Sequence, residues 1–493
     1  MRRKMPIFYS ALMLTGVNLL LRLVGTSFQV YISGRIGAAG VGLLQLVMSV
    51  GSLAMTAGMA GIRTTTMYLT AEELGRKKPG NVAWVLSGCF VYSILCSTLI
   101  STGLYFFAPY LAQNWIADVR TVGAIRLYAG FLPITCLCGV MTGYFTAANR
   151  IGTLAAVEVA EQLFSMTATL LILTFWAGTD PAKACQAVVF GGGISGVITL
   201  ISLVILRIRE HQPCASPIPV RSRLLQCAVP LAGADIVKSG ISTTENLMVP
   251  KRLSLFLGSE EPLAAFGLVC GMVFPVLMFP AAILFGLAEL LIPELARCAA
   301  AGSKERIQYL VKRTLRTAML YGFTFCAWMY LLAQPLCLKL YGSADAGIQL
   351  RRYCLMIPML YCDAVTDAMT KGLGQQKACV RYNIITSLLD VAFLYILLPR
   401  YGMGGYYVSF LVTHAINFIL SLRRLIKISG VRLRISTPIL TGAATVISVL
   451  IASFINAPIL AAAACSIILV CLLFLFRVVS REDVQWIKGL IHG

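Results

Sequence analysis

Two arginines interrupt apolar stretches of the sequence, and polar side chains accompany each of them. Arg22 has Asn18 one helical turn before it and Gln29 two turns after it, so all three fall on one stripe of a helix. Arg63 is followed by three threonines at positions 64–66, whose hydroxyl groups can donate hydrogen bonds to an anion. A charged side chain in the middle of a membrane costs roughly 2.5 to 3.5 kcal/mol, so such residues normally face a cavity or a partner.

A third cation, Lys238, repeats this pattern in the second half of the chain. Asp235 lies three residues before it and Glu245 seven residues after it, again on one helical face. An offset of 216 residues places Arg22 on Lys238 and Arg35 on Lys251. We interpret the cations as the lining of an anion-binding cavity. The alternative is that they pair with buried carboxylates and only hold helices together.

Carboxylates inside apolar segments are the candidates for coupling to an ion gradient. A buried carboxyl group can carry a proton, or in its ionised form hold Na⁺. For any single carboxylate, structural pairing remains the alternative. The candidates are distributed over both halves of the chain: Glu158, Asp235, Glu245, Asp363 and Asp390.

Other chemistry finds little support in the sequence. The nearest approach to a metal-binding pair is Cys136 and Cys138, which point to opposite faces of a helix, so we expect no metal site. A single intramembrane histidine, His414, is more typical of a packing residue than of an acyltransferase centre. No phosphate-binding glycine loop occurs, so we expect no direct use of ATP and no enzyme activity.

The composition identifies the elements that must position these residues. Of 493 residues, 58% are hydrophobic and 12% charged, which excludes an ordinary soluble protein, and the net charge of +21 is better explained by membrane topology than by nucleic-acid binding. At roughly 20 residues per membrane-spanning helix, the hydropathy predicts an all-α integral membrane protein with about 14 helices. The predicted segments are 8–33, 41–70, 84–108, 121–147, 151–177, 184–208, 224–250, 263–295, 307–334, 346–370, 379–399, 404–425, 437–456 and 458–477.

The distribution of basic residues predicts the orientation of these helices. If the N-terminus is cytoplasmic, cytoplasmic loops and termini take 28 of the 41 lysines and arginines, the outer side takes nine, and four lie within segments. Cytoplasmic loops of membrane proteins carry such an excess of positive charge. We therefore expect a multi-pass protein of the bacterial cytoplasmic (inner) membrane with both termini in the cytoplasm.

The longest polar connector divides the predicted helices into two groups. We expect an N-lobe of helices 1–6 at residues 1–210, a cytoplasmic linker at 211–223, and a C-lobe of helices 7–12 at 224–430. Six-helix halves related as parallel repeats are a recurring plan of transporters, with substrate bound between them near the midplane. Residues 431–493 then supply helices 13–14 and a cytoplasmic tail outside the repeat.

Several sequence runs resemble the stage V sporulation protein B-like polysaccharide flippases of the multidrug/oligosaccharidyl-lipid/polysaccharide exporter superfamily, which are related to lipid II flippases. The runs extend over nearly the whole chain and comprise residues 21–25, 34–46, 60–64, 70–73, 228–231, 247–253, 291–296 and 371–375. Arg22 matches the arginine that lipid II flippases carry in helix 1. Their next arginine, six positions on, is replaced here by Phe28, and their helix 2 arginine is absent.

This resemblance implies that the protein moves an undecaprenyl-pyrophosphate-linked saccharide from the inner to the outer leaflet by alternating access. It implies no cofactor, and the driving force is left open between membrane potential, H⁺ and Na⁺. The partners that we expect are the lipid-linked saccharide, membrane lipids and enzymes of cell-envelope synthesis. One alternative is a drug or metabolite/cation antiporter of the same superfamily. Another is a membrane scaffold for envelope or spore assembly.

Overall fold

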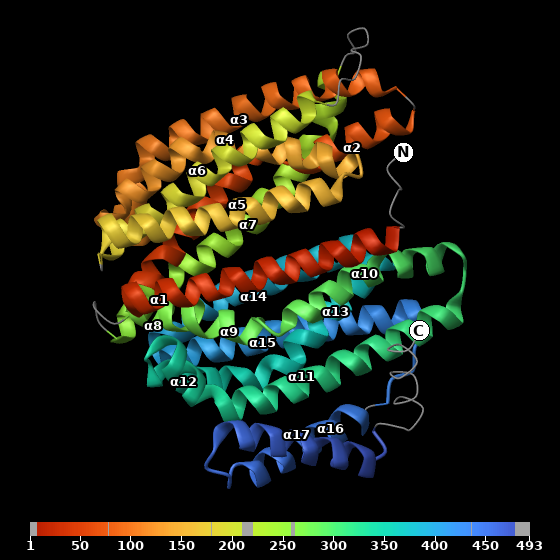
Figure 1. Ribbon diagram of the computed structural model, residues 1–493. Helices are drawn as coiled ribbons and strands as arrows, with labels where there is room; N and C mark the ends of the chain where they lie inside the picture. The colour runs from red at the N-terminus through yellow and green to blue at the C-terminus, as the bar shows by residue number, and fades with distance from the viewer. Residues whose placement is uncertain are drawn as a thin grey trace. The chain divides into compact units, whose positions relative to one another are not determined.

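The computed structural model describes residues 7–76, 78–178, 180–209, 220–257, 262–434 and 436–478. Every regular element in these ranges is helical. The α-helices, shown in Figure 1, are α1 (Ile7–Met59), α2 (Ile62–Gly75), α3 (Val82–Tyr110), α4 (Val122–Ala147), α5 (Ile151–Ile172), α6 (Pro181–Ile208), α7 (Arg221–Leu257), α8 (Pro262–Gly267), α9 (Phe274–Met278), α10 (Ala281–Ala300), α11 (Lys304–Tyr341), α12 (Ala344–Tyr353), α13 (Ile357–Gly372), α14 (Gln376–Tyr401), α15 (Met403–Ser429), α16 (Ser436–Ala452) and α17 (Pro458–Leu475).

Six short segments connect or extend these helices. Three are single 3₁₀ turns, η1 (Pro79–Asn81), η3 (Val119–Thr121) and η6 (Cys354–Met356). The others are wider π-helical turns, η2 (Leu111–Ile116), η4 (Leu173–Ala177) and η5 (Leu268–Val273).

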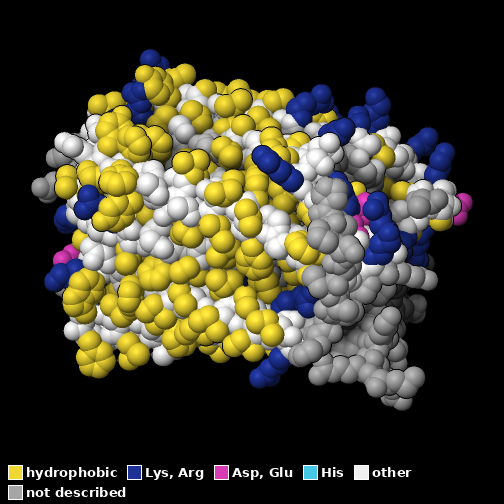
Figure 2. Space-filling view, turned by 90° about the horizontal axis from the view of Figure 1, so that it is seen from above, with side chains coloured by type: hydrophobic (Ala, Val, Ile, Leu, Met, Phe, Trp, Pro, Cys, Tyr) yellow, Lys and Arg dark blue, Asp and Glu magenta, His cyan; other side chains and the backbone are white. Residues whose placement is uncertain are grey.

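All fourteen predicted apolar segments fall on helices, so the all-α membrane fold is confirmed. Within the described residues, ten helical stretches are long and apolar enough to cross a membrane, or eleven with one bent pair. The first of them covers two predicted segments, because α1 has 53 residues, about 80 Å of helix, and bends at Gly37. The structure is thus compatible with about fourteen spans. Figure 2 shows a face whose middle is largely apolar, with Lys and Arg side chains mainly toward its two ends.

The chain forms two compact units. The first comprises Met1–Gly271 with Val391–Gly405, and the second Met272–Asp390 with Tyr406–Gly493. Helix α7, the first after the predicted linker, belongs to the first unit, where it packs on α1 and α2. The linker itself, apart from residues 220–223, and the tail after residue 478 lie outside the described residues, and the division into six-helix lobes stays a prediction.

Besides the single 3₁₀ turn η6 within the segment 346–370, two predicted segments are interrupted in the structure. The segment 41–70 breaks at Ala60 and Gly61, whose φ angles of 42° and 71° end one helix before α2 begins. The segment 263–295 becomes α8, η5, α9 and α10, with a bend of 62° before α10. Pro275 and Pro280 explain the second interruption, because proline lacks the N–H group that an uninterrupted helix needs.

In the second unit, α16 and α17 pack against α11. The indole Nε1 of Trp328 on α11 donates a 2.8 Å hydrogen bond to Ser466 Oγ on α17. An indole N–H inside an apolar segment needs such an acceptor, so this bond fixes the position at which α17 meets α11.

In the first unit, α1 and α8 cross at glycines. A Cβ atom on Gly267 would lie 1.9 Å from the carbonyl oxygen of Ala38 and 2.5 Å from the amide nitrogen of Gly42. Both atoms are backbone, so neither can move aside without shifting a helix. The crossing therefore requires glycine at position 267.

We expect Gly267→Ala to lower the free energy of unfolding by about 1–3 kcal/mol or more, the usual cost of overpacking. Thermal unfolding of the purified protein in detergent measures it. Gly103→Ala in α3 is the matched control, because a Cβ there meets no atom within 4 Å. Equal melting temperatures for the two variants would contradict the close crossing.

Candidate binding and coupling sites

Arg63 lies in the first turn of α2, directly after the break at Ala60 and Gly61. Its side chain is exposed, as is that of Thr64. Helix α4 approaches the backbone here through Gly143, where a Cβ would lie 2.5 Å from the Arg63 carbonyl oxygen. The first N–H groups of a helix have no partner within it and give its N-terminus a partial positive charge. Arg63 and the start of α2 therefore present positive charge inside a membrane-spanning stretch.

Two carboxylates on α5 lie close to each other, and one of them interacts with Arg63. Glu158 is half-buried and interacts electrostatically with Arg63. Glu161, one turn further along α5, hydrogen-bonds with Thr199 of α6. The structure thus brings together Arg63 and Glu158, which the sequence placed in separate candidate groups.

The candidate residues of α1 have different surroundings. Arg22 is exposed, and Gln29 is half-buried. The Gln29 side-chain Nε2 donates a 3.1 Å hydrogen bond to the carbonyl oxygen of Gly271 in η5, so Gln29 joins two segments of the first unit. The side chain of Asn18 lies outside what the structure describes.

On α7, Lys238 and Asp235 are both exposed, and Glu245 is half-buried. Lys238 forms no ion pair with any residue in the described ranges. Two hydrogen bonds attach the same helix to Ser49 of α1. Thr243 Oγ1 donates to the Ser49 carbonyl oxygen at 3.1 Å, and Asn246 Nδ2 donates to Ser49 Oγ at 3.0 Å. Lys238 therefore lies on a helix that two hydrogen bonds attach to α1.

A row of polar side chains on α15 contacts the two candidate carboxylates of the second unit. Asp390 of α14 accepts hydrogen bonds from Ser409 Oγ at 2.5 Å and Thr413 Oγ1 at 3.2 Å. Asp363 of α13 accepts two from Asn417 Nδ2, at 3.2 Å and 3.1 Å. Residues 409, 413 and 417 are four apart and so form one line along the helix.

The same row contains a buried acceptor without a donor. Asn417 is 7% exposed, and its side-chain oxygen has no hydrogen-bond partner. Carboxylate, hydroxyl and amide oxygens are hard ligands that suit Na⁺. A buried carboxylate can instead take up a proton. His414 lies on the same helix with its ring 4.2 Å from that of Phe410, consistent with a packing role.

Sequence inspection missed several of these partners. Thr199 carries no motif, and its pairing with Glu161 depends on the contact of α5 with α6. Ser409, Thr413 and Asn417 do carry a signal, because polar residues four apart in an apolar segment predict a polar line on one helical face.

We expect Asn417→Leu to lower the free energy of unfolding by about 1–3 kcal/mol, because it leaves Asp363 without its donor. Thermal unfolding in detergent checks this. Ser421→Ala, also buried on α15, is the control, since its hydroxyl contacts neither carboxylate. A loss no greater than that of the control would contradict the proposed importance of this bond.

The family model of MatE matches residues 14–159 and again residues 230–396. The chain belongs to the MatE family. The two matched segments begin 216 residues apart, which is also the offset that relates Arg22 to Lys238.

Relatives of known name agree with the MatE assignment. The chain is 21% identical to stage V sporulation protein B of Bacillus subtilis (strain 168) over 411 residues, 81% of this chain and 79% of the relative. Among solved structures it resembles the lipid II flippase MurJ in an inward closed conformation, with a TM-score of 0.73, 13% identity, and coverage of 94% of this chain and 99% of MurJ.

A multidrug resistance MATE family transporter in an inward-facing conformation is also similar, with a TM-score of 0.68, 15% identity, and coverage of 84% and 98%. This MatE protein therefore has the fold of the MurJ and MATE transporters, and the expected superfamily is confirmed.

Proposed function

We propose that this MatE protein is a flippase that moves an undecaprenyl-pyrophosphate-linked saccharide from the inner to the outer leaflet by alternating access. The observation that carries the proposal is the set of exposed cations within membrane-spanning helices, Arg22, Arg63 and Lys238. A diphosphate cannot cross hydrocarbon unaided, and guanidinium and ammonium groups offset its charge through charge-assisted hydrogen bonds.

Arg63 supports this proposal in a second way. It stands at the N-terminus of a helix that begins inside the span, where backbone N–H groups add to the attraction for phosphate oxygens. Discontinuous helices of this kind bind anionic substrate groups in transporters. Glu158 competes with the substrate for Arg63, so binding of a diphosphate requires that this carboxylate be displaced or protonated.

The membrane potential supports the proposed direction of transport. With both termini in the cytoplasm, most basic residues lie on the cytoplasmic side of the inner membrane. The inside-negative potential then favours outward movement of a negatively charged head group.

We expect Arg22→Ala, Arg63→Ala and Lys238→Ala each to slow the movement of a fluorescent undecaprenyl-pyrophosphate disaccharide. The expected factor is about ten- to hundredfold, because each variant loses one hydrogen bond to a charged group. Proteoliposomes and an external quencher measure the rate. Arg126→Ala is the control, because the Arg126 guanidinium lies 5.1 Å from the centre of the Tyr105 ring. Normal rates in all three variants would overturn the cationic site.

Coupling to H⁺ or Na⁺ is proposed for the polar row of the second unit. Asp390 and Asp363 have neutral hydrogen-bond donors there, so a proton or Na⁺ can bind them without displacing a buried cation. Asp235, Glu245 and Glu158 remain further candidates in the first unit. Asp390→Asn should reduce a gradient-driven rate to the rate without a gradient, whereas Ser421→Ala should keep the stimulation.

That comparison uses the same proteoliposomes with imposed Na⁺ or pH gradients. Full stimulation in both Asp390→Asn and Asp363→Asn would contradict coupling through this row.

A drug or metabolite/cation antiporter is the second candidate function. The observation that favours it is the carboxylate pair Glu158 and Glu161, which suits a cationic substrate. Gradient-driven extrusion of a cationic drug from the same vesicles, without movement of the lipid-linked disaccharide, would select it.

A further inference from the structure

A network of charged side chains joins α7 to the end of α2, away from the candidate sites above. Arg223, in the first turn of α7, donates from Nη2 to Glu72 Oε2 at 2.5 Å and from Nη1 to Glu73 Oε1 at 2.8 Å. Its planar guanidinium thus contacts two consecutive carboxylates at once. Arg223 lies 150 and 151 positions after the two glutamates in the chain, and all three residues belong to the first compact unit.

Glu73 is the central residue of this network. It is 1% exposed and also accepts a 2.8 Å hydrogen bond from Asn81 Nδ2 in η1. Glu72 accepts a second bond from Arg76 Nη2, at 2.5 Å. A buried carboxylate with this many donors is fully satisfied only while Arg223 stays in place.

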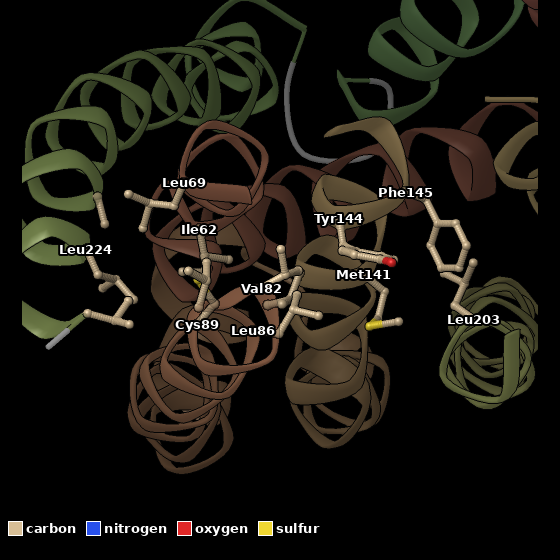
Figure 3. Packing of buried hydrophobic residues seen from close by; sticks show 14 of the residues in the cluster. Ile62, Leu69, Val82, Leu86, Cys89, Met141, Tyr144, Phe145, Leu203 and Leu224 are labelled. Atoms are coloured by element: carbon tan, nitrogen blue, oxygen red, sulfur yellow. The ribbon is translucent and has the colours of Figure 1, made fainter. Parts of the chain in front are cut away.

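An apolar contact lies directly beside the charged network. Val220 and Leu224 at the start of α7 are buried, and a Cβ on Gly88 of α3 would lie 3.4 Å from Val220 Cγ1. They belong to the same cluster as Leu69 and Cys89 of α2 and α3. Figure 3 shows Leu224 on one side of this cluster, facing the helices that carry Leu69 and Cys89.

This contact joins helices that belong to different matched segments of the family model. The second MatE match begins at residue 230, within α7, whereas α2 and α3 belong to the first match. The network therefore fastens the opening helix of the second repeat to the first repeat, at the end that the proposed topology places in the cytoplasm.

We propose that Arg223, Glu72 and Glu73 form a releasable latch that closes the cytoplasmic end of the transport path by holding α7 against α2 and α3. This rests on the alternating-access function proposed above. An ionic latch suits such a role, because water that enters an opening gate solvates separated charges, and a buried ion pair adds little net stability over an apolar contact.

The native Cys89 thiol provides a test that does not depend on transport. It is 0% exposed in the apolar layer beneath the latch. We would measure its alkylation by a water-soluble maleimide in the purified full-length protein, using peptide mass spectrometry to resolve each cysteine. Cys185 of α6, also 0% exposed in the first unit but outside this cluster, is the internal control.

Arg223→Ala should accelerate alkylation of Cys89 at least about tenfold, because the buried Glu73 carboxylate then loses its nearest cation. Cys185 should stay protected. The double variant that exchanges the two charges, Glu73→Arg with Arg223→Glu, should bring the rate of Cys89 alkylation back toward that of the unmodified protein.

Unchanged alkylation of Cys89 in Arg223→Ala would overturn the latch. So would an equal acceleration at Cys185, because the network would then only support the fold. If the protein moved no saccharide but Cys89 were alkylated slowly in the unmodified chain and faster in Arg223→Ala, the proposed function would be wrong and the latch would stand.

Discussion

The cost of an uncompensated charge in hydrocarbon is the constraint on which this structure depends. At roughly 2.5 to 3.5 kcal/mol for a side chain at mid-membrane, a protein keeps such a group only where a partner or a polar path compensates it. In the predicted topology most of the 41 basic residues avoid the cost, because they lie outside the membrane-spanning segments. Arg223 avoids it by pairing with Glu72 and Glu73. Lys238 has no such partner among the described residues, so its exposed ammonium requires water or an anion beside it.

The helix breaks follow from the same constraint, applied to the backbone. An unbroken helix satisfies its own N–H and C=O groups, and a break inside a membrane is tolerated only where other groups or water replace those bonds. At the break before α2, Tyr92 donates to the Ala60 carbonyl oxygen at 3.3 Å, while Arg63 follows within the next turn. The break and Arg63 therefore lie together. One polar region can satisfy both the backbone groups freed at the break and the Arg63 guanidinium.

Much of the fold can be predicted from the sequence, because helix formation in a membrane depends on local composition. Apolar length located every helical segment, and Gly342 and Gly402 end helices with a positive φ, which glycine adopts without strain. The break at Ala60 could not be predicted, because alanine gives no local signal for positive φ. At Gly61 the close approach of α7 leaves room only for glycine, because the Ala228 carbonyl oxygen would lie 2.8 Å from a Cβ there. The same holds for Arg223, which by charge alone is one more topological residue. Its pairing with Glu73 depends on a contact across 150 positions.

The two compact units surround their carboxylates in different ways, and this difference separates two kinds of chemistry. In the first unit Glu158 interacts with an arginine, so neutralising the carboxylate releases a cation that can then bind an anion. In the second unit the hydrogen-bond donors to Asp390 and Asp363 among the described residues are hydroxyl and amide groups, and these can rotate to coordinate an ion instead. Protonation of the first kind of site changes its affinity for anions, whereas occupancy of the second by H⁺ or Na⁺ releases no arginine. A transporter that binds a diphosphate and uses an ion gradient needs both properties, and keeping them in separate helix clusters lets a coupling cation bind away from the arginine, which would repel it.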